Sequence, residues 1–184
     1  MDYQQSRAYI RDAEQYAGGA LDLTNIKEIM KRLGNPQDQL KYVHVAGTNG
    51  KGSVIAYLYT TLTNAGYHVG RYISPSVYSY REKIEVEGTP ISREQFAKHT
   101  TRVAAVIEEM TAEGLAHPTP FEIETAVAFL FFAEEKCDPV ILEVGMGGIT
   151  DATNLIRTTE LAVLVPISMD HQSFLGNTIA EIAE

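Results

Sequence analysis

The residues best suited to chemistry form a glycine-rich stretch around one lysine. A β-branched run at 41–45 precedes the stretch, and an amphipathic segment follows it from Val54. This order predicts a strand, a phosphate-binding loop and a helix, because glycines let the backbone approach an anion while loop N–H groups, the helix N-terminus and a lysine supply positive charge. We interpret the stretch as a polyphosphate cradle made of Gly47, Thr48, Asn49, Gly50, Lys51, Gly52 and Ser53.

The cradle departs from the common P-loop pattern. That pattern places a glycine where this chain has Val45, and a serine or threonine where it has Gly52. The alternative is a glycine-rich turn with an incidental lysine. We favour the cradle because strand, loop and helix occur in the order that phosphate binding requires.

Glu143 is the most informative carboxylate of the chain. It lies in the apolar run 140–144, where an unpaired charge is costly, and it directly precedes the glycine turn 145–148. A magnesium ion that bridges nucleotide phosphates would satisfy this carboxylate, since magnesium prefers oxygen ligands. The alternative is a carboxylate bound by backbone N–H groups of the glycine turn.

Ser74 and His171 follow two other predicted strands. Ser74 precedes a proline and can simply shape a turn, and a lone histidine is more often structural than a ligand. However, Ser74, Glu143 and His171 each follow a separate strand of a predicted parallel sheet, at the edge where such sheets bind ligands. Together they can surround one phosphate site.

The remaining pattern predicts an α/β fold with a mostly parallel central sheet and helices on both faces. Strands are expected at 41–46, 68–74, 140–144 and 161–167, the last two as nearly continuous apolar runs that helices cover on both faces. Residues 76–91 read as an excursion from the sheet. Helices are expected at 2–17, 24–33, 53–64, 92–112 and 121–136, with Thr24 as one cap and with Ser92–Gln95, Thr119–Glu122 and Thr178–Glu181 as capping boxes.

Composition excludes several classes of protein. The 184 residues carry 15 basic and 24 acidic side chains, a net charge of -9, with no Lys/Arg cluster along the sequence, so nucleic acid and anionic membranes are not expected as partners. No apolar run reaches the roughly 20 residues that span a bilayer, and no signal pattern opens the chain, which predicts a cytoplasmic protein. Cys137, the only cysteine, reads as a packing residue.

Several blocks, in order, resemble the folylpolyglutamate and dihydrofolate synthase family of the Mur ligase superfamily. The loop Gly-Thr-Asn-Gly-Lys-Gly-Ser and the pair Leu-Glu-Val-Gly-Met-Gly-Gly and Asp-Ala-Thr-Asn are specific to that family within the superfamily. The blocks span almost the whole chain and lie at 43–53, 74–75, 121–122, 142–148, 151–154, 170–171 and 175–178.

The resemblance implies an ATP- and Mg2+-dependent ligase that joins L-glutamate to a folate or to dihydropteroate through an acyl phosphate, and that is a monomer as a full-length enzyme. It implies that Lys51 holds phosphate oxygens, that Ser74 and Glu143 hold one magnesium ion and that His171 binds a second. It also places Phe121, Glu122 and Asp151 at the pterin end of the substrate, although for Glu122 the capping role is an equal alternative.

Two departures and the chain end limit this expectation. Family members often have His where this chain has Ser76 and Arg where it has Ile149. The helix opened by Thr178 has barely begun at Glu184, which suggests a fragment, and the family continues to a carbamylated lysine and a second α/β domain. We therefore expect residues 1–184 to be an ATP-binding domain, with packing helices at 1–36, that is inactive alone. The alternatives are another ligase of the superfamily and a non-catalytic nucleotide-binding module.

Overall fold

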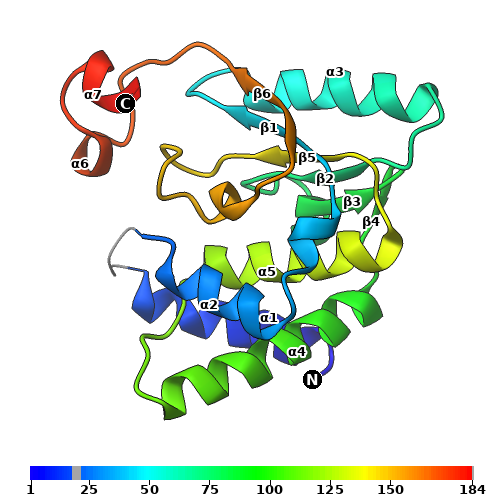
Figure 1. Cartoon of the computed structure of the whole chain (residues 1–184), viewed down its shortest axis with the longest axis vertical. Coiled ribbons are helices and arrows are strands. Elements are labelled where there is room, and N and C mark those ends of the chain that lie inside the picture. The colour runs from blue at the N-terminus through cyan, green and yellow to red at the C-terminus, as the bar shows by residue number, and fades with distance from the viewer. Residues whose placement is uncertain (18–21, 184) are drawn as a thin grey trace.

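A six-stranded sheet forms the centre of the computed structural model, which describes residues 1–17 and 22–183 (Figure 1). The strand order is β4-β3-β2-β5-β1-β6. Strands β2, β5, β1 and β6 run parallel to one another, whereas β3 pairs antiparallel with both of its neighbours, β2 and β4. The predicted mostly parallel sheet is therefore confirmed. The strands are β1 Tyr42–Ala46, β2 Gly70–Tyr72, β3 Ile84–Val86, β4 Thr89–Pro90, β5 Val140–Glu143 and β6 Thr159–Leu164.

Helices cover both faces of the sheet, as predicted. Figure 1 shows α3 on one face and α5 on the other, with α1, α2 and α4 beyond α5. The helices are α1 Tyr3–Asp12, α2 Thr24–Arg32, α3 Lys51–Asn64, α4 Arg93–Ala112, α5 Pro120–Glu135, α6 Gln172–Leu175 and α7 Ile179–Ala183; 3₁₀ helices span Ala13–Tyr16, Pro36–Gln39, Tyr80–Lys83 and Ala152–Leu155. Among the described residues, no helix is both long and apolar enough to cross a lipid bilayer.

Two hydrophobic cores hold the layers together. The larger lies between the sheet and the helices of the α5 side, and the smaller lies under α3. α5 is apolar on almost every face and is buried from Ile123 to Phe132, as its sequence predicts. Cys137 is buried in the larger core, in keeping with a packing role.

Both sheet edges differ from the prediction. Residues 84–90 do not leave the sheet: they return as β3 and β4 beside β2, where Arg71 of β2 forms a 2.6 Å ion pair with Glu85. β6, predicted as a covered strand, is instead an edge strand, with Leu161 48% and Leu164 76% exposed. Continuous apolarity therefore indicated a strand correctly but did not reveal its place in the sheet.

The helix caps confirm most of the capping predictions. Thr119–Glu122 and Thr178–Glu181 form reciprocal boxes. Ser92 caps α4, but the Gln95 amide donates to Glu135 at 2.8 Å instead of turning back. The predicted Thr24 cap is wrong, because the Thr24 N–H is itself capped by the carboxylate of Asp22 at 2.7 Å.

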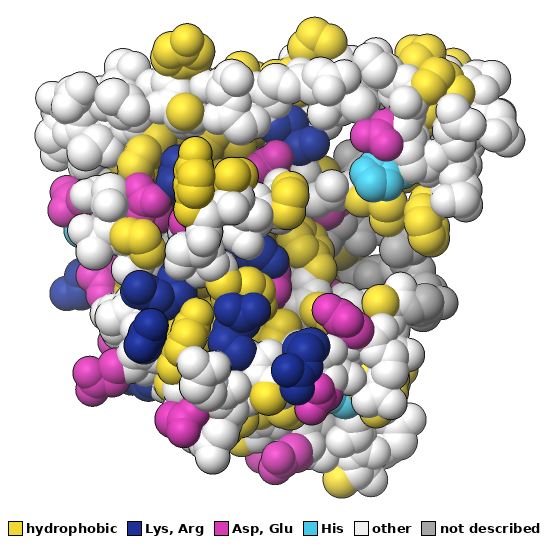
Figure 2. Space-filling model, turned by 180° about the vertical axis from the view of Figure 1, so that it is seen from behind, with side chains coloured by type: hydrophobic (Ala, Val, Ile, Leu, Met, Phe, Trp, Pro, Cys, Tyr) yellow, Lys and Arg dark blue, Asp and Glu magenta, His cyan; other side chains and the backbone are white. Residues whose placement is uncertain are grey.

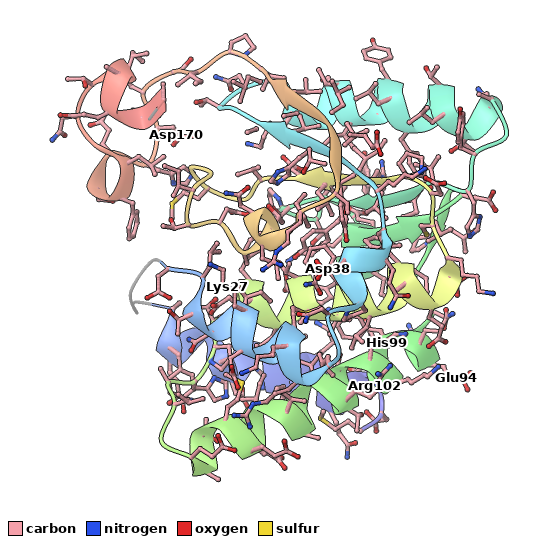
Figure 3. The ribbon with its side chains drawn as sticks, in the orientation of Figure 1. Lys27, Asp38, Glu94, His99, Arg102 and Asp170 are labelled. Atoms are coloured by element: carbon pink, nitrogen blue, oxygen red, sulfur yellow. The ribbon has the colours of Figure 1, made fainter. Side chains whose placement is uncertain are left out.

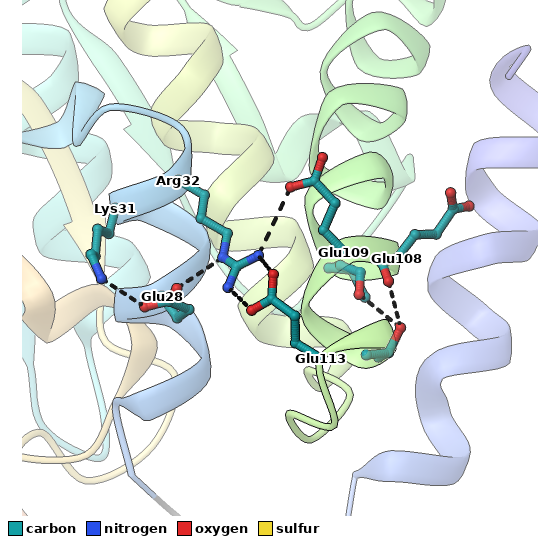
Figure 4. A network of polar contacts seen from close by, with 8 residues as sticks. Glu28, Lys31, Arg32, Glu108, Glu109 and Glu113 are labelled. Carbon is teal, nitrogen blue, oxygen red and sulfur yellow. Dashed lines mark hydrogen bonds and ion pairs between the residues drawn. The ribbon is translucent and has the colours of Figure 1, made fainter.

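Arg32 links α2 to α4 (Figure 4). Its guanidinium donates two hydrogen bonds to Glu113, at 2.9 and 2.6 Å, and one to Glu28 at 2.8 Å. A planar guanidinium suits this two-pronged contact, which connects α2 to the C-cap residue of α4.

His99 is a fully buried histidine of this helical layer. It lies on α4 near Arg102 (Figure 3), its side chain is 0% exposed, and neither ring nitrogen has a hydrogen-bond partner among the described residues. Burial lowers the pKa of His99 to about 4, opposed by Glu134 at 3.7 Å and assisted by Lys98 and Arg102. The unfolded chain therefore binds this proton more readily than the folded one.

We expect the free energy of unfolding to fall between pH 6.5 and pH 4, and to fall by about 2 kcal/mol more in the parent than in a His99→Leu variant. The reason is that the stabilisation by neutral His99 is present above pH 6.5 and disappears as the pH falls through that window. Urea unfolding at several pH values measures the difference. Parallel pH profiles for the two proteins would contradict the assignment.

Candidate functional site

The loop between β1 and α3 has a backbone that requires glycine. Gly47 has φ +126°, and a Cβ atom there would lie 2.5 Å from the carbonyl oxygen of Val165. The N–H groups of Thr48 and Asn49 donate to the Pro166 carbonyl at 3.1 and 3.3 Å. The loop is therefore pinned to the segment that follows β6.

The same loop opens α3 two residues earlier than the predicted start at Ser53. Gly50 adopts the left-handed conformation, φ +99°, as the N-cap, so Lys51 is the first helical residue. The first N–H groups of a helix have no partner within it, so Lys51, Gly52 and Ser53 present backbone donors beside the Lys51 ammonium. Lys51 Nζ itself donates to the Gly47 carbonyl at 2.9 Å.

Glu143 lies beside this lysine. Its Oε1 atom is 3.8 Å from Lys51 Nζ, its Oε2 atom accepts the Ser74 N–H at 3.1 Å, and the residue is 7% exposed. Burial raises the pKa of the Glu143 carboxyl, and the Ser74 N–H and Lys51 oppose that rise. The fold thus brings together three of the predicted site residues from the ends of three different strands, β1, β2 and β5.

The N–H groups of the glycine turn bind another carboxylate, that of Asp151. Its Oδ2 atom accepts from Gly145 and Met146, both at 2.9 Å, and its Oδ1 atom accepts from the N–H and hydroxyl of Thr153 at 2.9 and 2.5 Å. The alternative interpretation of Glu143, a carboxylate bound by backbone N–H groups of the glycine turn, is therefore wrong. Asp151 is the residue that shapes the turn.

His44 joins this network and was missed by the sequence analysis. Its Nε2 atom lies 2.8 Å from Thr153 Oγ1. Because the Thr153 hydroxyl gives its hydrogen to Asp151, it accepts from His44, and Nε2 must carry the proton. Burial lowers the pKa of His44, which keeps the ring neutral. A polar residue within an apolar strand was the available signal, as it was for Glu143.

Phe121 and Glu122 open α5 on the other side of the glycine turn. The Phe121 ring stacks on Tyr72, with centroids 6.1 Å apart, and a Cβ atom on Gly145 would lie 2.7 Å from Phe121 Cζ. Glu122 Oε2 accepts from the N–H and hydroxyl of Thr119 at 2.8 and 2.9 Å. Glu122 thus performs the capping role, which uses only one of its two carboxylate oxygens.

His171 lies in a different setting from the other predicted ligands. It is the left-handed N-cap of α6 and is half exposed, 3.9 Å from Asp170. It lines a cavity of about 410 Å³ together with Lys51, Gly47, His44 and the glycine turn, whereas Ser74 and Glu143 do not line that cavity. Among the described residues, no three His, Cys, Asp or Glu side chains come close enough to hold a metal ion by themselves.

We expect Asp151→Asn to destabilise the fold by about 3 kcal/mol, because its amide nitrogen would face a backbone donor and leave a buried N–H group unsatisfied. The urea midpoint measures the loss. Asp170→Asn is the matched control, since Asp170 is exposed and, in the described part of the chain, accepts a hydrogen bond only from the His171 N–H. Its effect should stay within about 0.5 kcal/mol. Equal midpoints for the two variants would show that the glycine turn does not depend on the Asp151 charge.

The chain is similar to known proteins along almost its whole length. No protein-family model matches the chain. It is 42% identical over 182 residues, 98% of its length, to the dihydrofolate synthase/folylpolyglutamate synthase of Bacillus subtilis, of which it covers 42%. The apo form of the Lacticaseibacillus casei folylpolyglutamate synthase superimposes with a TM-score of 0.92 at 36% identity, covering 99% of this chain and 44% of that one.

A folylpolyglutamate synthase solved with AMPPCP and folate superimposes with a TM-score of 0.90 at 36% identity, again over 99% of this chain and 44% of that one. The chain therefore spans less than half the length of the relatives that it matches.

Proposed function

We propose that this chain, which belongs by sequence and fold to the folylpolyglutamate and dihydrofolate synthase family, is the ATP-binding part of a ligase that adds L-glutamate to the γ-carboxylate of a folate. The observation that carries the proposal is the cluster of Lys51, Glu143 and Ser74 at the glycine loop. The solved relative that binds AMPPCP and folate supports both small molecules as ligands.

Lys51 and the N–H groups of the first turn of α3 are placed to hold the phosphates of ATP. The carboxylate of the acceptor attacks the γ-phosphorus and ADP leaves; the amine of glutamate then attacks the acyl carbon, phosphate leaves, and the nitrogen loses its proton. Such chemistry needs positioning and charge neutralisation more than a protein nucleophile. Lys51 supplies fixed positive charge where negative charge accumulates.

The residues beside Lys51 also fit a magnesium ion. Glu143 is a buried carboxylate to which the described residues supply one N–H donor, that of Ser74, with a lysine 3.8 Å away. The hydroxyl of Ser74 is proposed as a second oxygen ligand. Magnesium commonly takes one or two protein oxygens and completes its shell with phosphates and water. When bound, it would neutralise phosphate charge. His171 is proposed as a ligand of a second ion through the cavity that it shares with Lys51.

Phe121 and Asp151 are proposed to form the pterin end of the acceptor site. The Phe121 ring and the Asp151-bound glycine turn lie against each other, which gives a flat aromatic surface beside polar backbone. The second oxygen of Glu122, to which no donor among the described residues bonds, is proposed to contact the pterin. The Bacillus subtilis relative carries both activities in its name, so dihydropteroate is the second candidate acceptor.

The test is ADP release by the complete gene product, given Mg-ATP, glutamate and, in turn, tetrahydrofolate, dihydropteroate or a muramyl acceptor. We expect turnover with one or both pterin acceptors, from a monomer by sedimentation, and none from the isolated 184 residues. Turnover with the muramyl acceptor would instead assign another ligase of the superfamily. Binding of AMPPCP without turnover on any acceptor would favour a non-catalytic nucleotide-binding module.

A further inference from the structure

Residues 165–171, called the post-β6 segment below, connect β6 to α6 and run beside the phosphate-binding loop. The Pro166 carbonyl of this segment accepts from two N–H groups of the loop, those of Thr48 and Asn49. The segment then passes Asp170, labelled in Figure 3, and ends at His171. A side chain that holds the segment against the loop therefore also influences where His171 lies.

The hydroxyl of Thr48 holds the segment through a reciprocal pair of hydrogen bonds with the backbone of Ser168. Thr48 Oγ1 donates to the Ser168 carbonyl at 3.2 Å and accepts from the Ser168 N–H at 3.0 Å. A threonine hydroxyl has one hydrogen to donate, so in this arrangement it has none left for a phosphate oxygen. The two residues are 120 positions apart, so only the fold reveals the contact.

The hydrogen-bond donors of the glycine loop fall into two groups. The N–H groups of Thr48 and Asn49 bond the post-β6 segment, whereas those of residues 50–53 have no acceptor among the described residues. Unpaired N–H groups at the start of a helix are the donors that phosphates use. We therefore expect phosphate oxygens at residues 50–53 and at the Lys51 ammonium, and not at the Thr48 hydroxyl.

The cavity of Lys51 links the post-β6 segment to the proposed chemistry. Thr48, Asp170 and His171 all line this cavity. Residues of α6 and α7 line it as well, and Figure 2, which views the molecule from behind, shows the surface hollowed beneath the end that carries these two helices. The post-β6 segment is thus one wall of the cavity, and the Thr48 hydroxyl ties that wall to the phosphate-binding loop.

We propose that Thr48 is a positioning residue, whose hydroxyl holds the post-β6 segment so that His171 stays at the cavity of Lys51. The consequence for turnover rests on the proposed function, because only in the ligase does the place of His171 affect the reaction. Groups that stabilise developing charge act only when they are held in place. The sequence pattern puts Thr48 in the phosphate cradle, and its hydrogen bonds assign it this different task there.

The first test measures the amide exchange of Ser168 by NMR in the 184-residue chain. Thr48→Val keeps the shape of the side chain but loses the hydroxyl, so we expect exchange about fivefold faster than in the parent. Thr48→Ser keeps the hydroxyl and should stay within about twofold of the parent. Thr60→Val is the matched control, because Thr60 is exposed on α3 and its side chain makes no hydrogen bond among the described residues.

The second test separates a positioning residue from a phosphate ligand. AMPPCP should bind Thr48→Val within about threefold of the parent, because the hydroxyl does not contact phosphate. In the complete gene product, given Mg-ATP, glutamate and a pterin acceptor, Thr48→Val should lower kcat about tenfold while the KM for ATP stays within about threefold. Thr48→Ser should restore kcat, and urea midpoints show that each variant is folded.

Ser168 exchange at the parental rate in Thr48→Val, or an unchanged kcat, would overturn the proposal. A loss of AMPPCP affinity of about tenfold or more in Thr48→Val would also overturn it, because Thr48 would then be a phosphate ligand. So would a Thr48→Ser protein that behaves like Thr48→Val, because the hydroxyl would not be the cause. If the complete parent turns over no acceptor, the proposed function fails, and Ser168 exchange and AMPPCP affinity still decide whether Thr48 holds the segment.

Discussion

Replacing Lys51 with alanine should weaken the binding of AMPPCP by about 10- to 100-fold and leave the chain folded. Lys51 is the full positive charge of the glycine loop, and charge-assisted bonds to phosphate oxygens are among the stronger polar contacts of a protein. Among the described residues, the Lys51 ammonium hydrogen-bonds only the Gly47 carbonyl, with Glu143 at 3.8 Å. Calorimetric titration measures the affinity, and thermal unfolding monitors the fold.

Lys41→Ala is the control for this experiment. Lys41 precedes β1, its side chain is 57% exposed, and it forms a 3.6 Å surface pair with Asp138. The Lys41→Ala substitution removes the same charge from the protein, so it reports the long-range electrostatic effect alone. Unchanged affinity in Lys51→Ala, or an equal loss in both variants, would exclude Lys51 as the phosphate-binding lysine.

The central sheet was predictable because its signal is local. The runs at 42–46 and 140–143 are mostly buried, as is typical of parallel strands that helices cover on both faces. The run at 161–167 is equally apolar, but the strand that it contributes to, β6, is an edge strand. The composition of a segment predicts that it forms a strand. Its position in the sheet depends on pairing with distant segments, which a single sequence does not reveal.

The caps show where local rules fail. Thr119 and Glu122 bond each other because they occupy the N-cap and N3 positions of one helical turn. Gln95 has the same spacing from Ser92, yet its amide is drawn to Glu135 of the neighbouring helix. A tertiary contact thus overrides the local pattern, and no spacing rule contains that information.

Some residues of the candidate site were likewise predictable from local patterns, whereas others are brought together only by the fold. Lys51, Glu143 and Ser74 meet because parallel strands end at one edge, a geometric consequence that the sequence predicts. His171 depends on the path of a loop after β6 rather than on the sheet. The Asp151–Thr153–His44 network joins a loop to a strand more than a hundred positions earlier, so only the fold reveals it.

Glu143→Gln should remove the magnesium dependence of nucleotide binding while preserving the fold. Glutamine keeps the shape of the side chain, and its carbonyl oxygen can still accept the Ser74 N–H. Magnesium, however, loses the only negatively charged ligand proposed for it beside Lys51, and a neutral amide oxygen is a weaker ligand for a hard cation. AMPPCP titrations with and without MgCl2 measure the effect.

The raised pKa of Glu143 distinguishes a loss of magnesium dependence from simple unfolding of the variant. Because burial raises the pKa of the folded carboxyl, the protonated form stabilises the fold at low pH, and that stabilisation is lost as the pH rises from 4.5 through the folded pKa. The glutamine variant avoids the loss, so at pH 7 it should be at least as stable as the parent. Glu94→Gln, at an exposed position on α4, is the control that should keep the parent's response to magnesium. A stable Glu143→Gln protein that still responds to magnesium like the parent would remove Glu143 from the metal site.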